Sequence, residues 1–139
     1  MRKLIVVLFI TPTSKVLLKT KEINKRKFLV LFEAWQKRGE SIYGTVARIV
    51  KEVESFAPPQ TFRIKFEKLK EVEMNTRFGK VKKIYYVCYL PFTPIIEGNS
   101  EVMIAGKEKL ITLRKQIPRE QYLIILEVIG TQKSLTDFL

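Results

Sequence analysis

Apolar runs and turn residues divide the first part of the chain into predicted β-strands. Val, Ile and Phe dominate residues 4–10, and Pro12 ends this run. Residues 15–21 and 28–35 predict two further strands, which a polar, cationic loop at residues 23–27 separates. We therefore expect three consecutive strands before the first helix.

The second half of the chain carries the pattern of a hairpin. Residues 61–73 alternate between apolar and charged positions, which is the period of a half-buried strand. The apolar positions of this alternation are Phe62, Ile64 and Phe66. Asn75 and Gly79 bracket a turn, residues 81–90 predict a strongly β-prone strand, and residues 101–105 predict one more short strand.

Three segments are candidates for helices. Residues 42–56 follow Ser41, whose hydroxyl can accept a hydrogen bond from an exposed N–H of the first helical turn. Residues 107–115 are either a short helix or an irregular segment. Residues 118–129 begin at Pro118, which favours a helix start, although their Leu and Ile content also suits a strand.

The order of these elements, β-β-β-α-β-β-(β)-α, predicts an α+β fold in which helices pack on a mixed β-sheet. At 139 residues the chain has the size of one domain, with a core over about residues 3–130 and a C-terminal tail at residues 131–139. The start, MRKLIVVLFITPTSK, has the basic pair and apolar run of a signal peptide, but the run is short and no small-residue cleavage site follows. No apolar run reaches about 18 residues, so we expect a cytoplasmic protein without a membrane span.

The chain is strongly basic, with 26 Lys and Arg against 14 Asp and Glu and a net charge of +12. Such a charge favours an anionic partner, namely RNA, a nucleotide or an acidic protein, whereas the plainer interpretation is a lysine-rich soluble surface. The lysines are spread through the sequence, which argues against a disordered basic tail. Abundant Lys, Ile and Glu with few Asn and Gln also suit a thermophile.

Several kinds of catalytic site are excluded by composition. The chain has no histidine, which removes a Ser-His-Asp triad, a Cys-His dyad and a His-ligated zinc. Cys88 is the single cysteine and lies in an apolar run typical of a core position, and Asp137 is the single aspartate. Any catalysis therefore depends on Glu, Lys, Tyr or Arg.

The spacing of residues 34–56 resembles the Nudix box, G-x5-E-x7-R-E-U-x-E-E-x-G-U, in which U is a bulky apolar residue. The defined positions that match without a gap are Glu40, Arg48, Val50, Glu52 and Phe56. The layout of strands before and after the box is also similar over about residues 3–130. The resemblance implies a Nudix-like α/β/α sandwich, with the box on a loop and helix that follow a strand.

Four defined positions depart from the box. They are Ala34, Ile49, Val53 and Ser55, which stand where the box has Gly, Glu, Glu and Gly. Family members hydrolyse a nucleoside diphosphate linked to another group, and the resemblance implies that box glutamates hold Mg²⁺ or Mn²⁺. Because an alkyl side chain cannot bind such a cation, Ile49 and Val53 remove two carboxylates, and Glu52 remains as the candidate metal ligand.

The predicted helix carries a broad apolar stripe. At about 100° per residue, this stripe contains Ile42, Val46, Ile49, Val53 and Phe56. Either the helix is deeply buried, with Glu40, Arg48 and Glu52 as surface or capping residues, or the face of Ile49 and Val53 is exposed and binds a protein partner. Arg48 and Glu52 also have the i,i+4 spacing of an exposed helical ion pair.

Cationic and aromatic side chains occur in and around the loop that, in active relatives, wraps the phosphates. The candidate binding residues are Trp35, Lys37 and Arg38 in this loop, Lys25, Arg26 and Lys27 before it, and Lys80, Lys82 and Lys83 after it. Such cations bind phosphate backbones through charge and counterion release, and Trp35, Tyr85 and Tyr89 are candidates for stacking on bases. Core packing is the alternative for Trp35 and, because neighbouring side chains of a strand point to opposite faces, for the tyrosines.

We therefore expect a non-catalytic Nudix-like domain that binds RNA or a nucleotide-containing partner, alone or within a larger assembly, and needs no cofactor. Nudix-like domains without catalysis are found as RNA-binding and ribosome-associated components. One alternative is a divergent pyrophosphohydrolase with Glu40, Arg48 and Glu52 as catalytic residues, Mg²⁺ or Mn²⁺ as cofactor, and Glu97 or Glu101 completing the metal site. The other is a protein-interaction module that uses the apolar helix face.

Overall fold

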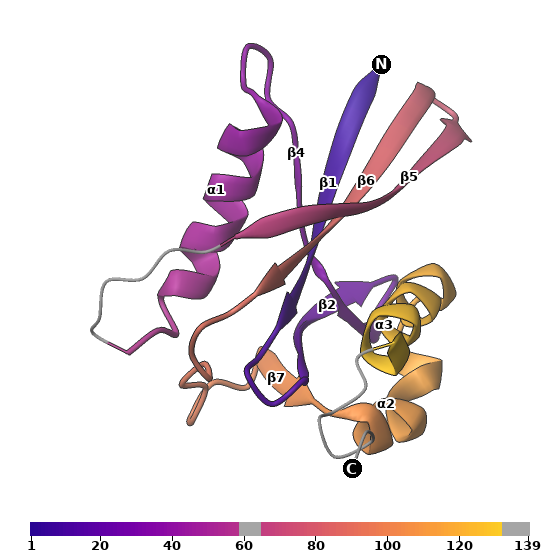
Figure 1. Cartoon of the computed structure of the whole chain (residues 1–139). Helices are drawn as coiled ribbons and strands as arrows, with labels where there is room; N and C mark the ends of the chain where they lie inside the picture. Colours follow the sequence, from indigo (N-terminus) through magenta and orange to yellow (C-terminus); the bar gives the residue numbers. More distant parts are fainter. Residues whose placement is uncertain (59–64, 132–139) are drawn as a thin grey trace.

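The computed structural model describes residues 1–58 and 65–131 of the chain. The described strands are β1 (Arg2–Ile10), β2 (Val16–Ile23), β3 (Arg26–Val30), β4 (Phe32–Trp35), β5 (Phe66–Thr76), β6 (Gly79–Tyr89) and β7 (Val102–Ala105). The described helices are α1 (Ile42–Glu54), α2 (Lys107–Leu113), the 3-10 helix η1 (Arg114–Gln116) and α3 (Arg119–Thr131). The strands join in one mixed sheet with helices packed on it, which confirms the predicted α+β sandwich (Figure 1).

Strand β1 is the centre of this sheet. It pairs in parallel with β6 along its whole length, from Arg2 opposite Val81 to Ile10 opposite Tyr89. Its other edge is shared, because β4 pairs with residues 4–7 and β2 joins it at Ile10. β2 then leaves β1 to pair with β3 and β7. A pocket lies where β2 and β4 diverge, lined by residues of both strands.

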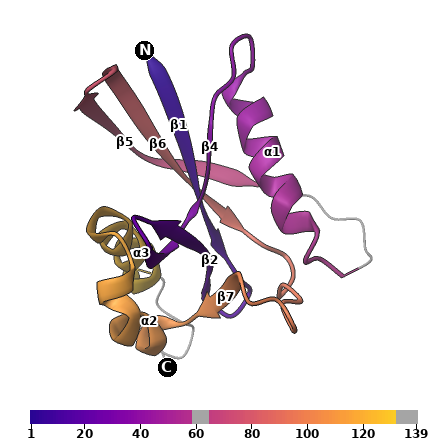
Figure 2. The same ribbon diagram turned by 180° about the vertical axis from the view of Figure 1, so that it is seen from behind.

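Alternate side chains of β1 enter two separate cores. On the side of α1 the core contains Ile5, Val7 and Phe9. On the side of α2 and α3 it contains Leu4, Val6, Leu8 and Ile10. Figures 1 and 2 show α1 on one side of the sheet and α2 with α3 on the other. Burial on both faces explains why residues 4–10 are continuously apolar rather than alternating.

The strand predicted at residues 28–35 is wrong in one respect, because the structure divides it into β3 and β4. Leu31 lies between them and is buried, and its backbone N–H donates to Oε1 of Gln121 on α3 at 2.8 Å. The chain breaks here because β3 pairs with β2 whereas β4 pairs with β1. The buried Gln121 amide thus supplies an acceptor where the ladder of strand hydrogen bonds is interrupted.

The predicted helices are confirmed, with shifted ends. The helix expected at residues 42–56 is α1, and Ser41 caps it by accepting from the Gly44 N–H at 3.0 Å. Residues 107–115 are helical as α2 and η1, and residues 118–129 fall on α3, so the strand alternative for the second segment is wrong. Within the described ranges, no helix is long and apolar enough to cross a bilayer.

The predicted hairpin has the expected turn, but its first strand is more exposed than expected. β5 and β6 meet at Thr76 opposite Gly79, inside the expected turn. Phe62 and Ile64, which began the predicted alternation, lie outside the described residues. Beyond Phe66 most side chains of β5 are exposed, so the expected half-buried strand is largely an exposed edge strand. Its alternating charges are typical of edges that resist further pairing.

Replacing Gln121 tests the hydrogen bond at the strand break. We expect Gln121→Leu to lower the free energy of unfolding by about 1–3 kcal/mol, because the Leu31 N–H then stays buried without this acceptor. Urea denaturation measures the difference. Gln116→Leu, at an exposed position of η1, is the matched control and should change stability by less than about 0.5 kcal/mol. Equal stability of the two variants would contradict this role of Gln121.

Candidate functional site

The loop between β4 and α1 is shaped by its backbone. Gly39 has a φ of +78°, in the left-handed region that favours glycine. The Glu40 N–H donates to the Lys37 carbonyl at 3.0 Å, and Nε2 of Gln36 donates to the Glu40 carbonyl at 2.7 Å. The side chains of the loop therefore project from a closed turn at the start of α1.

The Glu40 carboxylate joins this loop to the helix. Its Oε2 accepts from Nε of Arg48 at 2.7 Å, and its Oε1 accepts from Nη2 of Arg48 at 2.8 Å. Oε1 also accepts from the Thr45 hydroxyl at 2.7 Å and the Lys37 N–H at 3.1 Å, while Arg48 Nη2 donates to the Trp35 carbonyl at 2.8 Å. Arg48 thus pairs with Glu40 and not with Glu52, so the expected i,i+4 pair is wrong.

The same contacts set the charge of Glu40. The hydrogen bonds from Arg48, with further donation from Thr45 and the Lys37 N–H, lower the pKa of the Glu40 carboxyl to about 2. The carboxylate in turn raises the pKa of Arg48. Two residues that match the box therefore hold strand, loop and helix together as an ion pair.

The helix face that the resemblance assigns to the metal is buried. Ile49 is 2% exposed and Val53 is 0% exposed, and both pack with Ile5, Val7 and Phe9 of β1. The alternative in which this face is exposed and binds a partner is therefore wrong. The burial of this apolar face is confirmed, but the helix as a whole is not deeply buried, because Tyr43 is 73% exposed and Ala47 is exposed. Burial against an apolar strand leaves no room for a hydrated divalent cation at these positions.

Glu52 is the carboxylate that the box retains near this face, and it has a cationic partner. Nζ of Lys19 on β2 donates to Oε1 of Glu52 at 2.5 Å. The same ammonium lies 5.6 Å from the centroid of the Phe32 ring. A lysine ammonium therefore lies against the box carboxylate that the alternative hydrolase assigns to its metal.

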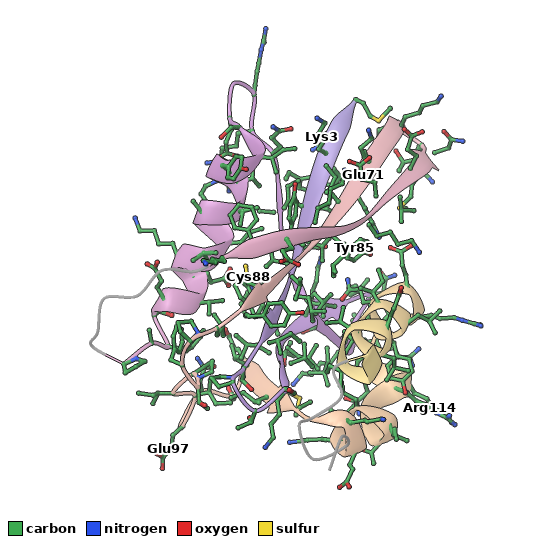
Figure 3. All side chains as sticks on the ribbon, in the orientation of Figure 1. Lys3, Glu71, Tyr85, Cys88, Glu97 and Arg114 are labelled. Atoms are coloured by element: carbon green, nitrogen blue, oxygen red, sulfur yellow. The ribbon has the colours of Figure 1, made fainter. Side chains whose placement is uncertain are left out.

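The carboxylates expected to complete a metal site lie elsewhere. The Glu101 carbonyl accepts from the Thr20 N–H, whereas Val102, the next residue, packs in the core beside α1. Because alternate residues of an extended chain face opposite ways, Glu101 points away from that core. Figure 3 places Glu97 in the loop at the far end of the molecule from Lys3. The described part of the chain groups no three His, Cys, Asp or Glu side chains that fit a metal ion.

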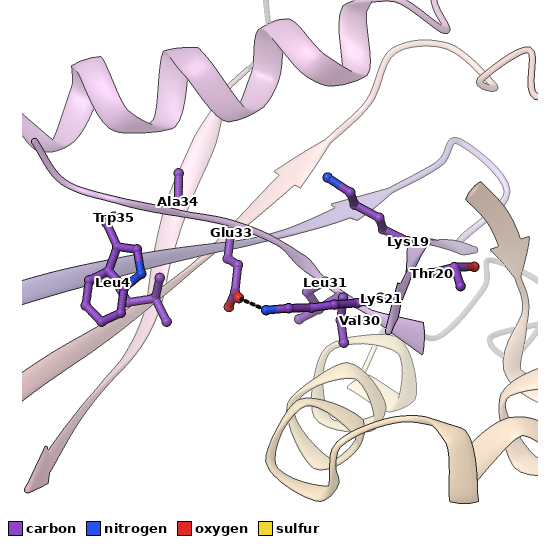
Figure 4. A pocket seen from close by; sticks show the side chains of 9 residues that line it. All are labelled: Leu4, Lys19, Thr20, Lys21, Val30, Leu31, Glu33, Ala34 and Trp35. Carbon is purple, nitrogen blue, oxygen red and sulfur yellow. Dashed lines mark hydrogen bonds and ion pairs between the residues drawn. The ribbon is translucent and has the colours of Figure 1, made fainter. Parts of the chain in front are cut away.

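A pocket of about 340 Å³ lies between β4 and β2 (Figure 4). Leu4 and Trp35 form its apolar wall, and Lys21 Nζ reaches Glu33 Oε1 at 3.1 Å across it. Lys19 lines the pocket as well, and its side chain points toward α1. The pocket thus combines an aromatic surface with the paired charges of Glu33 and Lys21, while the Lys19 ammonium is directed toward Glu52 on α1.

Trp35 lies between this pocket and a cationic surface. Its side chain is 41% exposed, and the Arg2 guanidinium lies 4.3 Å from its ring centroid. Next to it, a hollow of about 410 Å³ is lined by Met1, Arg2, Lys3, Gln36, Lys37, Arg38, Gly39 and Glu40. The predicted binding residues Lys37 and Arg38 are therefore joined by Arg2 and Lys3, which the sequence reasoning missed. The signal was the basic pair before the first strand.

The β5–β6 hairpin adds cations to the same end of the sheet. Lys82 lies opposite Lys3 in the β1–β6 ladder, and Lys80 lies one residue beyond the Arg2 position. Lys82 is 3.5 Å from Glu71, and Lys83 turns to the other face and reaches Glu120 at 3.4 Å. The tip carries Phe78, which is 87% exposed and which the sequence reasoning also missed.

The structure separates Lys25, Arg26 and Lys27 from this surface. They lie at the tip of the β2–β3 hairpin, where Asn24 and Lys25 have positive φ. β3 contacts η1, because β2 has left β1 by this point. The Arg26 guanidinium lies 5.1 Å from the Phe28 ring. These cations form a second basic patch beside the C-terminal helices.

The predicted stacking residues have different outcomes. Tyr85 is buried, and its hydroxyl donates to Glu120 on α3, so a stacking role for Tyr85 is wrong. Burial, followed by this hydrogen bond, raises the pKa of Tyr85. Tyr89 is 46% exposed but lies at the opposite end of β6 from Lys80. Cys88 is confirmed as a core residue, and burial raises the pKa of its thiol to about 12.

Several solved structures share this arrangement. The NUDIX domain of Shewanella oneidensis NrtR complexed with ADP ribose has a TM-score of 0.68 and 16% identity, over 94% of this chain and 88% of that one. A NUDIX-family hydrolase from Clostridium perfringens has a TM-score of 0.67 and 12% identity, over 94% and 97% of the two chains. NrtR complexed with a 27mer DNA has a TM-score of 0.66 and 19% identity, over 88% of this chain but 57% of the longer NrtR chain.

These likenesses identify the fold. The class is an α/β/α sandwich in which a capped helix follows the fourth strand and covers one face of the sheet. Within that class, the chain has the Nudix fold, as the box spacing led us to expect. No protein-family model and no curated protein matches the sequence.

Restoring a box carboxylate tests whether the helix face still tolerates charge. We expect Val53→Glu to lower the free energy of unfolding by about 3 kcal/mol or more, because an unpaired carboxylate enters an apolar core. Lys51→Glu, at an exposed position of α1, is the control and should change it by less than about 0.5 kcal/mol. A stable Val53→Glu protein that binds Mg²⁺ in calorimetry would contradict this interpretation.

The Glu40–Arg48 pair predicts a pH dependence. The pKa of Glu40 falls from 4.5 to about 2 on folding, so the stabilisation is complete above about pH 4.5 and is lost as the pH falls toward 2. We expect the melting temperature of wild type to drop across this window and that of Glu40→Gln to drop less. Glu54→Gln, on the exposed side of α1 without an ion pair in the described part of the chain, should keep the wild-type slope. Identical slopes for Glu40→Gln and wild type would contradict the pairing.

Proposed function

We propose that this chain is a Nudix-like domain that binds RNA without metal-dependent hydrolysis. The observation that carries the proposal is the burial of Ile49 and Val53, since two positions that the resemblance assigns to metal ligands are core side chains. The exposed chemistry near the same helix is cationic and aromatic instead. One neighbour of the same fold, NrtR, has been solved both with ADP ribose and with DNA, although this chain spans only 57% of the DNA-complexed NrtR chain, and this supports a nucleotide or nucleic-acid ligand.

The RNA-binding surface is the cationic sheet end, which comprises Arg2, Lys3, Lys37, Arg38, Lys80 and Lys82. Three segments far apart in the sequence meet there, namely the start of β1, the loop before α1 and the β5–β6 hairpin. Glu40 lies among these cations, but its carboxylate is already held by Arg48. The surface therefore keeps a positive excess, and phosphate backbones bind such surfaces through charge and counterion release.

Exposed aromatic rings favour single-stranded RNA over a duplex. Trp35 and Phe78 border the cationic sheet end, and both rings are accessible. A base can stack on an aromatic side chain when it is not stacked between neighbouring bases of a duplex. Such bases occur in single strands and loops. A second patch for the same phosphate backbone comprises Lys25, Arg26 and Lys27. Lys83 is the least available of the predicted binding residues, because it forms an ion pair with Glu120.

A nucleotide-containing partner is the second candidate ligand, and the pocket between β4 and β2 favours it. Its volume of about 340 Å³ falls in the range of small-molecule sites, and it combines Trp35 and Leu4 with the polar pair of Glu33 and Lys21. A hydrolase would turn over nucleoside diphosphate derivatives with Mg²⁺ or Mn²⁺ and lose activity in Glu52→Gln. If no nucleotide in a panel is hydrolysed with Mg²⁺ or Mn²⁺, the chain binds its ligand without catalysis.

Fluorescence anisotropy with a single-stranded RNA of about 12 nucleotides tests the proposed surface. Replacing Lys37 and Arg38 together by Ala should reduce the slope of log K against log salt by about 1.4, since each lost phosphate contact on a single strand removes about 0.7. The matched control is the Lys107→Ala and Lys109→Ala double variant, which removes the same charge from exposed positions of α2.

Two results would contradict the proposal. One is no binding of the RNA at low salt, and the other is binding that does not depend on salt. A single-stranded DNA of the same length and a duplex RNA run in parallel show whether the ligand is RNA and whether it is unpaired. Equal losses in the loop and α2 variants would show that net charge, rather than this surface, controls binding.

A further inference from the structure

The tip of the β5–β6 hairpin carries an aromatic ring that is almost fully exposed. Phe78 is 87% exposed, and Figures 1 and 2 show the hairpin tip projecting from the end of the sheet away from α3. The turn is held by Thr76, whose hydroxyl donates to the Gly79 carbonyl at 2.7 Å and accepts from the Phe78 N–H at 3.2 Å. Arg77 and Lys80 flank the ring in the sequence. The hairpin tip therefore presents an apolar group between two positive charges.

A pocket of about 370 Å³ lies between the other end of this hairpin and α3. The apolar and aromatic side chains that line it are Leu69, Val87, Tyr89, Ile124 and Val128. Val87 and Ile124 are buried and form its floor, whereas Leu69 and Tyr89 are partly exposed. A benzene ring fits in an apolar cavity of about 150 Å³. The pocket therefore has room for the ring of a phenylalanine.

A β-bulge in β5 enlarges the apolar wall of this pocket. Neighbouring side chains of a regular strand point to opposite faces of the sheet. The register of β5 against β6 shifts between Lys68 and Lys70, and both Leu69 and Lys70 line the pocket. Bulges redirect side chains in this way. The irregularity of the strand thus places Leu69 on the pocket side.

The charged rim of the pocket is more acidic than the chain as a whole. Glu67, Lys70 and Glu127 line the pocket, whereas the chain has 26 Lys and Arg against 14 Asp and Glu. Glu67 takes part in no ion pair within residues 1–58 and 65–131. An apolar group with positive charges beside it therefore complements the pocket in both polarity and charge.

We infer that this pocket receives the hairpin tip of a second copy of the chain, with the Phe78 ring in the apolar cavity. The flanking cations of the tip then lie beside the carboxylates of the rim. The tip does not reach the pocket of its own chain, because Phe78 precedes β6 and Val87 lies near the other end of this strand. The 11 residues of β6 span about 35 Å.

The contact joins two different surfaces of the chain. A variant that lacks one of these surfaces still keeps the other. One hairpin tip buries a small area, so we expect transient self-association that increases with protein concentration. This inference goes beyond the proposed RNA binding and does not depend on it, because the pocket lies at the opposite end of the hairpin from the cationic sheet end.

Sedimentation equilibrium of the full chain at rising protein concentration tests the inference. At about 0.15 M salt, repulsion between the two basic chains is screened beyond about 8 Å. We expect the association constant to fall about tenfold or more in Phe78→Ser and in Leu69→Lys, since each variant removes one side of the contact. Tyr89→Lys, at a second partly exposed position of the pocket, should repeat the result of Leu69→Lys. The matched controls Ile111→Ser and Ile111→Lys, at an exposed position of α2, should associate as wild type does.

Mixing the two deficient variants identifies the contact. Phe78→Ser keeps its pocket and Leu69→Lys keeps its hairpin tip, so an equimolar mixture should form a one-to-one complex that neither variant forms alone. A contact between two Phe78 rings would leave this mixture monomeric, and that result would overturn the inference. Wild type that stays monomeric, or controls that lose association equally, would also overturn it.

The RNA titration described above, repeated on Leu69→Lys, separates this inference from the proposed function. Leu69→Lys should bind RNA with the salt slope of wild type, because Leu69 lies outside the cationic sheet end. Normal RNA binding by a strictly monomeric wild type would remove the self-association and leave the proposed function standing. Self-association without RNA binding in wild type would have the opposite meaning.

Discussion

The pairing of β1 with three neighbouring strands positions the helices, the strand break and the pocket. β6 occupies one edge of β1, while β4 and β2 divide the other. Because β1 is covered on both faces, its alternate side chains fill two cores and fix α1 on one side and α3 on the other. The division of one edge between β4 and β2 also breaks the chain at Leu31 and leaves the pocket between the two strands.

The residues of the box in the β4–α1 loop and in α1 have structural roles in this chain. Glu40 and Arg48 pair with each other and tie the loop to the helix. Ile49 and Val53 complete the core against β1. Apolar side chains at these positions avoid the desolvation cost of a buried carboxylate. The spacing of the box is therefore compatible with a helix that lacks the carboxylates of a metal site.

The fold determines where the basic residues of the chain gather on its surface. The β1–β6 ladder brings Lys3 beside Lys82, and the turn after Trp35 places Lys37 and Arg38 next to Lys3. Basic residues at the β2–β3 hairpin are directed elsewhere, because β2 turns away from β1. The electrostatic surface is thus set by strand pairing and not by the density of lysines along the sequence.

From the sequence alone came the α+β class, most of the strands and the capped helix after Ser41, because apolar periodicity and caps act within a few residues. The sequence left residues 107–115 and 118–129 open between helix and other structure, and it merged β3 and β4 into one strand. It also predicted that Cys88 is buried and that Ile49 and Val53 remove carboxylates. The tertiary structure decided that Arg48 pairs with Glu40, that Lys19 reaches Glu52, and which cations share a surface. Those contacts join residues from different strands and helices, and their partners are fixed by the register and divergence of the strands, which local patterns do not encode.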